Sequence, residues 1–86
     1  MKYVYLLQSI PHPSQRYVGL TTDIEKRLTS HNAGQSPHTA HHRPWKIITY
    51  HAFADEEKAA AFEAYLKSGS GRAFGEKHFW SEEKIV

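Results

Sequence analysis

The sequence contains no cysteine, and this absence removes several classes of protein from consideration. Without cysteine there is no disulfide framework, no thiolate zinc site and no cysteine nucleophile. A chain free of disulfides suits a reducing compartment, so we expect a cytoplasmic protein. Long apolar runs are also missing, because no stretch approaches the roughly 20 residues of a membrane span. The apolar N-terminal stretch stops at Gln8, which is too early for a signal peptide. From these two absences we expect no membrane partner.

An excess of charge of one sign is also lacking. The chain has 11 Lys and Arg against 9 Asp and Glu, which gives a net charge of +2 at pH 7. The sequence pI is nevertheless about 9.0, and seven histidines add positive charge below neutrality. Such mild basicity permits a nucleic-acid partner without demonstrating one. The length of 86 residues predicts one small domain over residues 1–86.

Three segments are rich in aromatic and β-branched residues and predict strands. Residues 2–8 are followed by two prolines, and residues 16–21 resume the extended pattern, so these two segments suggest a hairpin with a long loop. Residues 45–53 predict a third strand. Gly19 interrupts the second strand, which indicates either a close approach to the backbone or a bulge. The pairing register is not readable, so whether Tyr5 meets Tyr17 stays open.

The first predicted helix covers residues 23–33. Thr22 opens a capping-box pattern, with a glutamate three residues later, and Gly34 supplies a stop. Arg27 and His31 are spaced i and i+4, beside the apolar face of this helix. They suit a polar site, but an arginine extending to solvent and a histidine favoured by the helix dipole explain the same pattern.

A second helix is predicted over residues 55–68 and a third over residues 72–79, with Ser70 as the cap of the third. Glu63 is the only one of the nine acidic residues that borders the apolar face inside a helix. An i,i+4 pair with Lys67, worth about 0.2–0.5 kcal/mol, is the plain alternative to a functional role. The inward stripe of the second helix is predicted to contain Ala59, Phe62, Leu66 and Ser70.

Histidines are frequent enough to raise the question of a metal site. The candidates are His31, His38, His41, His42 and His51. Two of them are adjacent, there is no HExxH pattern, and no cysteine assists them. We therefore favour a polar loop that happens to be rich in histidine over a dedicated zinc site.

The order of these features along the chain resembles the GIY-YIG nuclease superfamily, in the form of its small stand-alone bacterial members. The similar region runs from residue 2 to residue 79. It begins with the two halves of the name-giving motif, continues with the helix of Arg27, and ends with the helix of Glu63. The matching segments are Tyr3-Val4-Tyr5, Tyr17-Val18-Gly19 and residues 27–34, 39–50 and 61–67.

The resemblance implies an α/β (α+β) fold with a small three-stranded antiparallel sheet flanked by helices. It also implies a divalent-metal endonuclease site across the sheet face. By position, Tyr5 and Tyr17 are the motif tyrosines, Arg27 contacts phosphate, and Glu63 is the metal ligand. His31 matches a polar position one turn after the arginine.

The activity implied by the resemblance is hydrolysis of DNA phosphodiester bonds with one Mg²⁺ or Mn²⁺ ion. A free tyrosine has a pKa near 10, so a tyrosine base needs nearby positive charge or a chain of waters. We favour Tyr17 as the general base and Tyr5 as the residue that orients water or phosphate, and the two roles are interchangeable. Substrate preference is expected to depend on DNA structure, to be weakly sequence-specific, or to come from a protein partner, and RNA remains open.

Further residues are expected to contact nucleic acid. They are Gly19, Arg16, Lys46, Lys67 and Arg72, and at Gly19 the site is expected to come close to the scissile group.

The chain departs from the family at Tyr3, which replaces a motif glycine. It also lacks the asparagine that several members carry after the glutamate helix. The candidates for replacing that asparagine are Ser68, Ser70 and Arg72, so weak activity is expected.

Two other functions remain compatible with the sequence. One is a non-catalytic nucleic-acid-binding module on a degenerate GIY-YIG fold, which would bind in a salt-sensitive manner without cutting. The other is a protein-interaction domain that docks a partner through exposed Trp45, Phe79 and Trp80.

Overall fold

Three strands, β1 (Lys2–Ser9), β2 (Arg16–Thr21) and β3 (Trp45–Phe53), form one antiparallel sheet in the order β2-β1-β3. The structure is a computed structural model and describes residues 1–80. All three strands were predicted, and the bounds of the second and third agree with the prediction. The predicted domain extends to residue 86, so its last six residues lie outside the described part.

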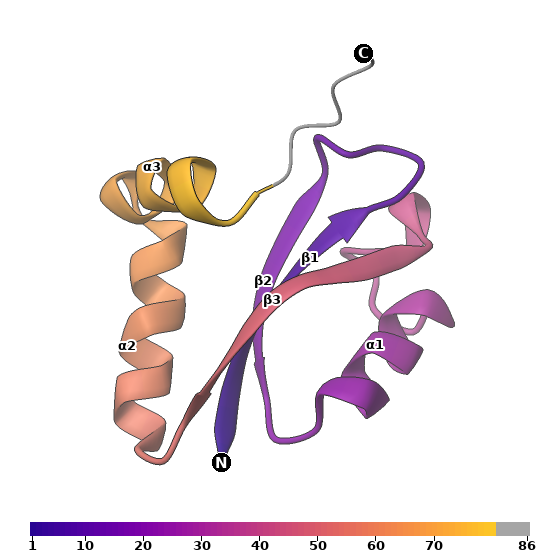
Figure 1. Ribbon diagram of the computed structural model, residues 1–86. Coiled ribbons are helices and arrows are strands. Elements are labelled where there is room, and N and C mark those ends of the chain that lie inside the picture. The colour runs from indigo at the N-terminus through magenta and orange to yellow at the C-terminus, as the bar shows by residue number, and fades with distance from the viewer. Residues whose placement is uncertain (81–86) are drawn as a thin grey trace.

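Helices cover both faces of this sheet (Figure 1). One face carries α1 (Ile24–Asn32), and the other carries α2 (Glu56–Lys67) and α3 (Gly69–His78). A short 3₁₀ turn, Ala40–His42, lies in the connection between α1 and β3. The expected α/β fold, a small antiparallel sheet flanked by helices, is therefore confirmed.

The register of the strands decides which side chains share a face. Tyr5 pairs with Gly19 on β2, and the ladder between β1 and β2 is regular. On the other side, Leu6 pairs with Thr49 and Leu7 with Ile47, so β3 carries one extra residue there. Such a bulge shifts the alternation of the strand, which allows both ends of β3 to bury apolar side chains.

The sheet separates two hydrophobic clusters. Val4 and Leu6 point toward α2, where they pack with Ala59 and Leu66 in a purely apolar cluster. The next residues along β1 point the other way, as the pleat requires. Tyr5, Leu7 and Trp45 form this second cluster, with Tyr17, Leu28 and Ile47 packed against it.

The helix ends correct three of the sequence-based expectations. Asp23, not Thr22, caps α1, because its carboxylate accepts a hydrogen bond from the Lys26 amide at 3.0 Å. Ser68, not Ser70, caps α3, and its hydroxyl accepts from Gly71 N at 3.2 Å. Ser70 therefore lies exposed in the first turn of α3 and is not part of the inward stripe of α2. The chain turns sharply at residue 68 because a new cap forms there, which a count of apolar spacing does not detect.

Other expectations about the helix ends agree with the structure. Gly34 follows α1 with φ of 77°, the left-handed conformation that favours glycine after a helix. Asp55 caps α2 by accepting from the amides of Glu57 and Lys58. Within residues 1–80 there is no helix with the length and apolar character needed to cross a membrane.

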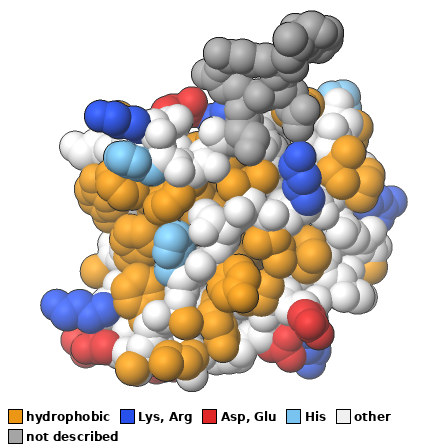
Figure 2. Space-filling view, in the orientation of Figure 1, with side chains coloured by type: hydrophobic (Ala, Val, Ile, Leu, Met, Phe, Trp, Pro, Cys, Tyr) orange, Lys and Arg blue, Asp and Glu red, His pale blue; other side chains and the backbone are white. Residues whose placement is uncertain are grey.

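Several large hydrophobic side chains are exposed on the surface. Figure 2 shows hydrophobic side chains gathered on one face, with charged side chains around its margin. Tyr50, Tyr65 and Phe74 are exposed, whereas Trp45 is only 4% exposed. The expectation that Trp45 docks a partner is therefore wrong. Its indole lies in the cluster beneath α1, where it donates a hydrogen bond to a backbone carbonyl.

Candidate active site

Tyr5 is the centre of a polar cluster between β1, β2 and α1. Its side chain is 1% exposed, and its hydroxyl lies 3.0 Å from Nε2 of His31. The rings of Tyr5 and Tyr17 lie 6.1 Å apart, and the ring of Tyr17 lies 4.9 Å from the imidazole of His31. The sequence left open whether the two motif tyrosines meet, and the register of β1 and β2 brings them together.

His31 is fully buried, and both of its ring nitrogens are hydrogen-bonded. Its Nδ1 lies 2.8 Å from the hydroxyl of Thr39, a residue that is itself 1% exposed. Of the two explanations offered by the sequence, a polar site beside the apolar face describes His31 better than a histidine favoured only by the helix dipole. Burial, and secondarily the positive charge of Arg27, lowers the pKa of His31, so the imidazole is neutral at pH 7.

Arg27 brings a positive charge to the tyrosines. Its guanidinium lies close to the phenol of Tyr5, and this polar interaction raises the pKa of Arg27. Burial raises the pKa of Tyr5, and the nearby guanidinium of Arg27 opposes that effect without overcoming it. Tyr5 is therefore a neutral phenol at physiological pH. Arg27 is half-buried, which leaves part of its side chain accessible from outside.

Gly19 is glycine because the Tyr5 phenol occupies the space of a side chain. A Cβ atom at this position would lie 2.5 Å from the Tyr5 hydroxyl oxygen and 2.9 Å from a ring carbon of Tyr17. Of the two explanations offered by the sequence, the structure shows the close approach, because the ladder is regular there and has no bulge. The approach is made by the tyrosines themselves.

Glu63 lies on the other side of the sheet from this cluster. It belongs to α2, whereas Arg27 belongs to α1, and the two helices cover opposite faces (Figure 1). A site spread across one sheet face, as the resemblance implied, is therefore not what the structure shows. Because β2 is an edge strand, the two sets of residues can be approached together around that edge.

A groove runs along the β2 edge. It has a volume of about 540 Å³ and lies between β2 and the helices α2 and α3. Tyr17 lines this groove and also packs against the Tyr5 cluster, so it is common to both. Phe62 packs against β3, whereas Lys67 lines the groove, so Glu63, one turn before Lys67, lies toward the groove side of α2.

The Glu63 carboxylate forms an ion pair with Lys67 at 2.6 Å, the plain alternative raised by the sequence. The carboxylate is largely buried, with 18% of its side chain exposed. Within residues 1–80 no three histidine, cysteine or acidic side chains are close enough together to hold a metal ion. A single carboxylate still fits Mg²⁺, which keeps most of its ligands as water and phosphate oxygens.

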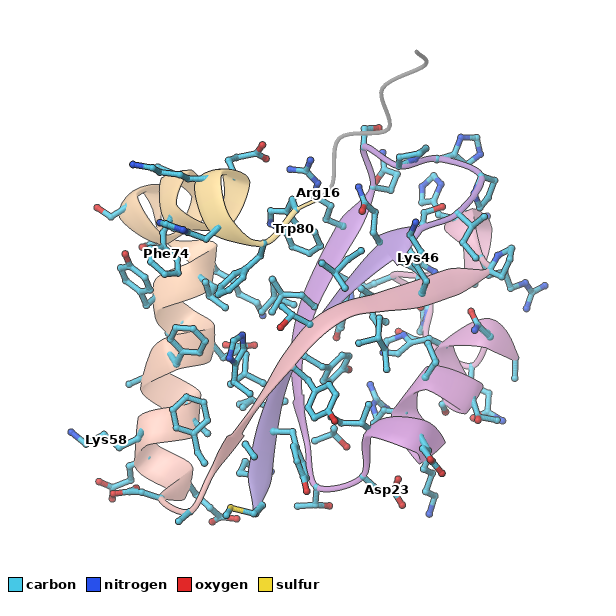
Figure 3. All side chains as sticks on the ribbon, viewed as in Figure 1. Arg16, Asp23, Lys46, Lys58, Phe74 and Trp80 are labelled. Carbon is cyan, nitrogen blue, oxygen red and sulfur yellow. The ribbon has the colours of Figure 1, made fainter. Side chains whose placement is uncertain are left out.

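The predicted nucleic-acid contacts separate into two groups. Lys67 and Arg72 line the groove and are exposed, as a phosphate contact requires. Arg16 also lines it, but its guanidinium lies over the ring of Trp80 at 5.1 Å and forms an ion pair with Glu76 (Figure 3). Lys46 lies at the start of β3, opposite Gln8 of β1, and does not line this groove (Figure 3).

Sequence reasoning missed Thr39 and the pairing of Arg16 with Glu76. Thr39 lies in a loop without periodicity, so no local pattern distinguished it from its polar neighbours. Its carbonyl accepts a hydrogen bond from Nε1 of Trp45 at 2.8 Å, while its hydroxyl meets His31. Arg16 and Glu76 are 60 positions apart, and only the placement of α3 beside β2 joins them.

Comparison with known proteins identifies the family of this chain. The family model described as the GIY-YIG catalytic domain matches residues 1–77. The chain belongs to the GIY-YIG family.

The relatives matched by the chain are small proteins of similar length. UPF0213 proteins of Streptococcus pyogenes serotypes M3 and M5 are each 35% identical over 72 residues, which cover 83% of this chain and 76% of theirs. The solution NMR structure of a UPF0213 protein from Bacillus halodurans is similar with a TM-score of 0.53 and 29% identity. That match covers 90% of this chain and 82% of the other.

Proposed function

We propose that this chain is a divalent-metal-dependent endonuclease that hydrolyses DNA phosphodiester bonds. Family membership supports a nuclease. The observation that carries the proposal is the convergence of Tyr5, Tyr17, Arg27 and His31 beside a groove with basic side chains. An enzyme of this kind must remove on the order of 20 kcal/mol of barrier, which requires charge stabilisation as well as proton transfer.

The difference in burial between the two tyrosines supports different roles for them. Tyr17 is half-buried and lines the groove, so it is the one that can reach a water molecule or the substrate. We assign it as the general base. Tyr5 is buried and neutral, so it acts on Tyr17 and Arg27 by hydrogen bonding and does not touch the phosphate. Its proposed role changes accordingly, from orienting the substrate to orienting the other side chains.

Arg27 has the chemistry of a phosphate clamp. A guanidinium offers several fixed donors and stays charged at any physiological pH. With its inner side held by Tyr5, its remaining donors are available to a non-bridging phosphate oxygen as charge develops in the transition state.

Glu63 is the residue that would hold one Mg²⁺ or Mn²⁺ ion. When bound, such an ion polarises the phosphate and stabilises the leaving oxygen. The ammonium of Lys67 neutralises the Glu63 carboxylate in this structure, so the ion would compete with that pair. Since the pair is worth only about 0.2–0.5 kcal/mol, it is a weak competitor for a divalent cation.

The second candidate is a nucleic-acid-binding module without catalysis. Two observations favour it. The Glu63 carboxylate is already paired with the ammonium of Lys67, and Lys67 and Arg72 are exposed in the groove. On this proposal the groove holds phosphates, binding weakens steeply with salt, and no metal is needed.

The deciding experiment compares three proteins on branched, single-stranded and duplex DNA with Mg²⁺, Mn²⁺ or chelator. They are the wild type, Glu63→Ala and the control Glu57→Ala, which removes an exposed carboxylate from the first turn of the same helix. Metal-dependent cleavage that is lost in Glu63→Ala and kept in Glu57→Ala supports the nuclease. Equal activity in all three proteins rejects Glu63 as the metal ligand.

Binding without cleavage in every condition overturns the nuclease proposal and favours the binding module. A protein partner that supplies specificity, and RNA as the substrate, are tested by repeating the assay with structured RNA and with cell extract added. Cleavage of RNA in preference to DNA overturns the substrate assignment and leaves the chemistry unchanged.

A further inference from the structure

We propose that Thr39 is a positioning residue of the tyrosine cluster. Its hydroxyl fixes His31 in the tautomer that carries the proton on Nδ1, so that Nε2 accepts the hydroxyl proton of Tyr5. Thr39 thereby decides the direction in which the Tyr5 hydroxyl points. The consequence for cleavage rests on the proposed nuclease function, whereas the tautomer itself does not.

The first line of argument comes from the Thr39 end. The hydroxyl oxygen of Thr39 lies 2.8 Å from Nδ1 of His31 and 3.5 Å from the carbonyl oxygen of Ser36. Both contacts can be hydrogen bonds at once only if the hydroxyl donates to the carbonyl of Ser36, which can only accept, and its oxygen accepts from Nδ1–H of His31. A neutral imidazole carries a single N–H, so Nε2 is then an acceptor.

The second line of argument comes from the Tyr5 end. The guanidinium of Arg27 lies near the phenol of Tyr5 and can only donate, so it cannot receive the Tyr5 proton. Tyr5 keeps its own proton, since burial raises its pKa, and this proton needs an acceptor. Nε2 of His31 lies 3.0 Å away. Both ends of the chain of hydrogen bonds therefore point to the same tautomer.

Thr39 is held rigidly enough to impose this choice. It is 1% exposed, and its carbonyl accepts a hydrogen bond from Nε1 of Trp45 at 2.8 Å. Trp45 is in turn 4% exposed and belongs to β3. Its amide also donates to Asn32 of α1 at 2.6 Å. The loop between α1 and β3 is thus fixed at both ends, and the Thr39 hydroxyl has little freedom to turn.

The opposite tautomer would have a definite cost. Its Nε2–H would occupy a lone pair of the Tyr5 oxygen and leave the Tyr5 proton without His31 as acceptor. Arg27 cannot receive that proton because it has no acceptor atom. With Nδ1 protonated, the Tyr5 proton instead has Nε2 of His31 as its acceptor, and His31 uses no lone pair of the Tyr5 oxygen.

The test reads the tautomer directly by NMR of protein labelled with ¹⁵N at histidine, at neutral pH and without DNA or metal. Long-range ¹H–¹⁵N correlations distinguish a protonated ring nitrogen from an unprotonated one, and His31→Gln identifies the His31 signals. The expected result for the wild type is a protonated Nδ1 and an unprotonated Nε2. A protonated Nε2 in the wild type overturns the proposal without any further variant.

Two variants separate positioning from packing. Thr39→Val keeps the shape and loses the hydroxyl, whereas Thr39→Ser keeps the hydroxyl. We expect the His31 signals to move toward the Nε2–H tautomer in Thr39→Val and to return in Thr39→Ser. An unchanged tautomer in a folded Thr39→Val overturns the role of Thr39. If Thr39→Val does not fold, the wild type and Thr39→Ser decide the question, and a difference in tautomer between those two overturns the proposal.

Cleavage assays then link the tautomer to the proposed function. Thr39→Val should lower kcat by about ten- to a hundredfold with little change in KM, the size typical of a residue that orients an active-site histidine. Thr39→Ser should restore kcat. If the wild type does not cleave, the nuclease proposal fails while the tautomer result still stands. A tautomer change with unaltered kcat overturns the link between the two.

Discussion

The two faces of the sheet are built from the same strands but by different physical means. Beneath α2 the buried residues are Val4, Leu6, Ala59 and Leu66, and none of them carries a polar side-chain atom. Beneath α1 a comparable space holds Tyr5, His31 and Thr39, which are joined by hydrogen bonds of 2.8–3.0 Å. Successive residues of β1 supply the two faces alternately.

This difference indicates that one face stabilises the fold and that the other holds the buried hydrogen-bond network. Apolar burial is worth about 25 cal/mol per Å² and needs no special geometry. A buried polar network gives little net stability but holds its members in one arrangement, since each unpaired group would cost about 1–3 kcal/mol. The α2 face is therefore the source of stability, and the α1 face is the source of a preorganised site.

The largest effect is expected from the apolar face. Leu66→Ala should lower the free energy of unfolding by about 2–5 kcal/mol, because Leu66 is 4% exposed within the apolar cluster. Urea denaturation measures the change. The control Lys58→Ala, at an exposed position of the same helix, should stay within about 0.5 kcal/mol. A loss below 1 kcal/mol for Leu66→Ala would contradict the assignment of stability to this face.

A smaller loss of stability and a complete loss of function are expected from the polar face. Tyr5→Phe removes one oxygen and leaves His31 and Arg27 without that partner, at a cost of about 1–3 kcal/mol. Cleavage should fall below detection. Tyr50→Phe is the matched control, since Tyr50 is 55% exposed, and it should change neither quantity. Full cleavage by Tyr5→Phe would remove Tyr5 from the site.

The pH dependence of stability should reveal a histidine on the apolar face. His51 lies among aromatic rings, 5.2 Å from Phe62 and 5.1 Å from Phe79, and its Nε2 is buried without a hydrogen-bond partner. Burial lowers the pKa of His51 in the folded state. Since the unfolded chain then binds more protons, stability is full above a pH of about 6.5 and is lost as the pH falls below that value.

Urea midpoints at pH 7 and pH 5 measure this effect. His31 contributes in the same direction, because its pKa is also lowered. His51→Leu should reduce the loss between the two pH values, whereas the control His38→Gln, at an exposed loop position, should leave it unchanged. An identical loss in His51→Leu and in the wild type would show that His51 does not contribute.

The smallest effect on stability is expected at the Glu63–Lys67 pair. Glu63→Ala and Lys67→Ala should each change the free energy of unfolding by less than about 0.5 kcal/mol, because an i,i+4 pair contributes no more than that. Thermal and urea unfolding measure it. A loss above about 1 kcal/mol would give Glu63 a structural role and weaken its assignment as a metal ligand.

The sequence predicted the local elements well and the ends of some helices poorly. The strands and the first two helices followed from residue type and periodicity, which act within a few residues. The start of α3 did not, because the four glycine and serine residues that follow α2 fit a break as well as a new helix. There the capping bond from Ser68 and the packing of α3 beside β2 decided the outcome.

For the candidate site, the sequence by itself determined which residues are the candidates. Tyr5, Tyr17, Arg27, His31 and Glu63 were singled out by motif and by helical spacing. Their grouping was decided only by the tertiary structure. The strand register places Tyr5 opposite Gly19, which is fixed by pairing between segments that the sequence does not align. Glu63 falls on the opposite face because α2 packs on that side of the sheet.

Thr39 marks the limit of sequence reasoning most clearly. It lies in a loop without periodicity, and its importance comes from three contacts with residues 3 to 8 positions away that converge only in the folded chain. Local patterns report which face of a helix or strand is apolar. They do not report which buried polar groups find one another, because that depends on distances between elements and on the need to satisfy every buried donor.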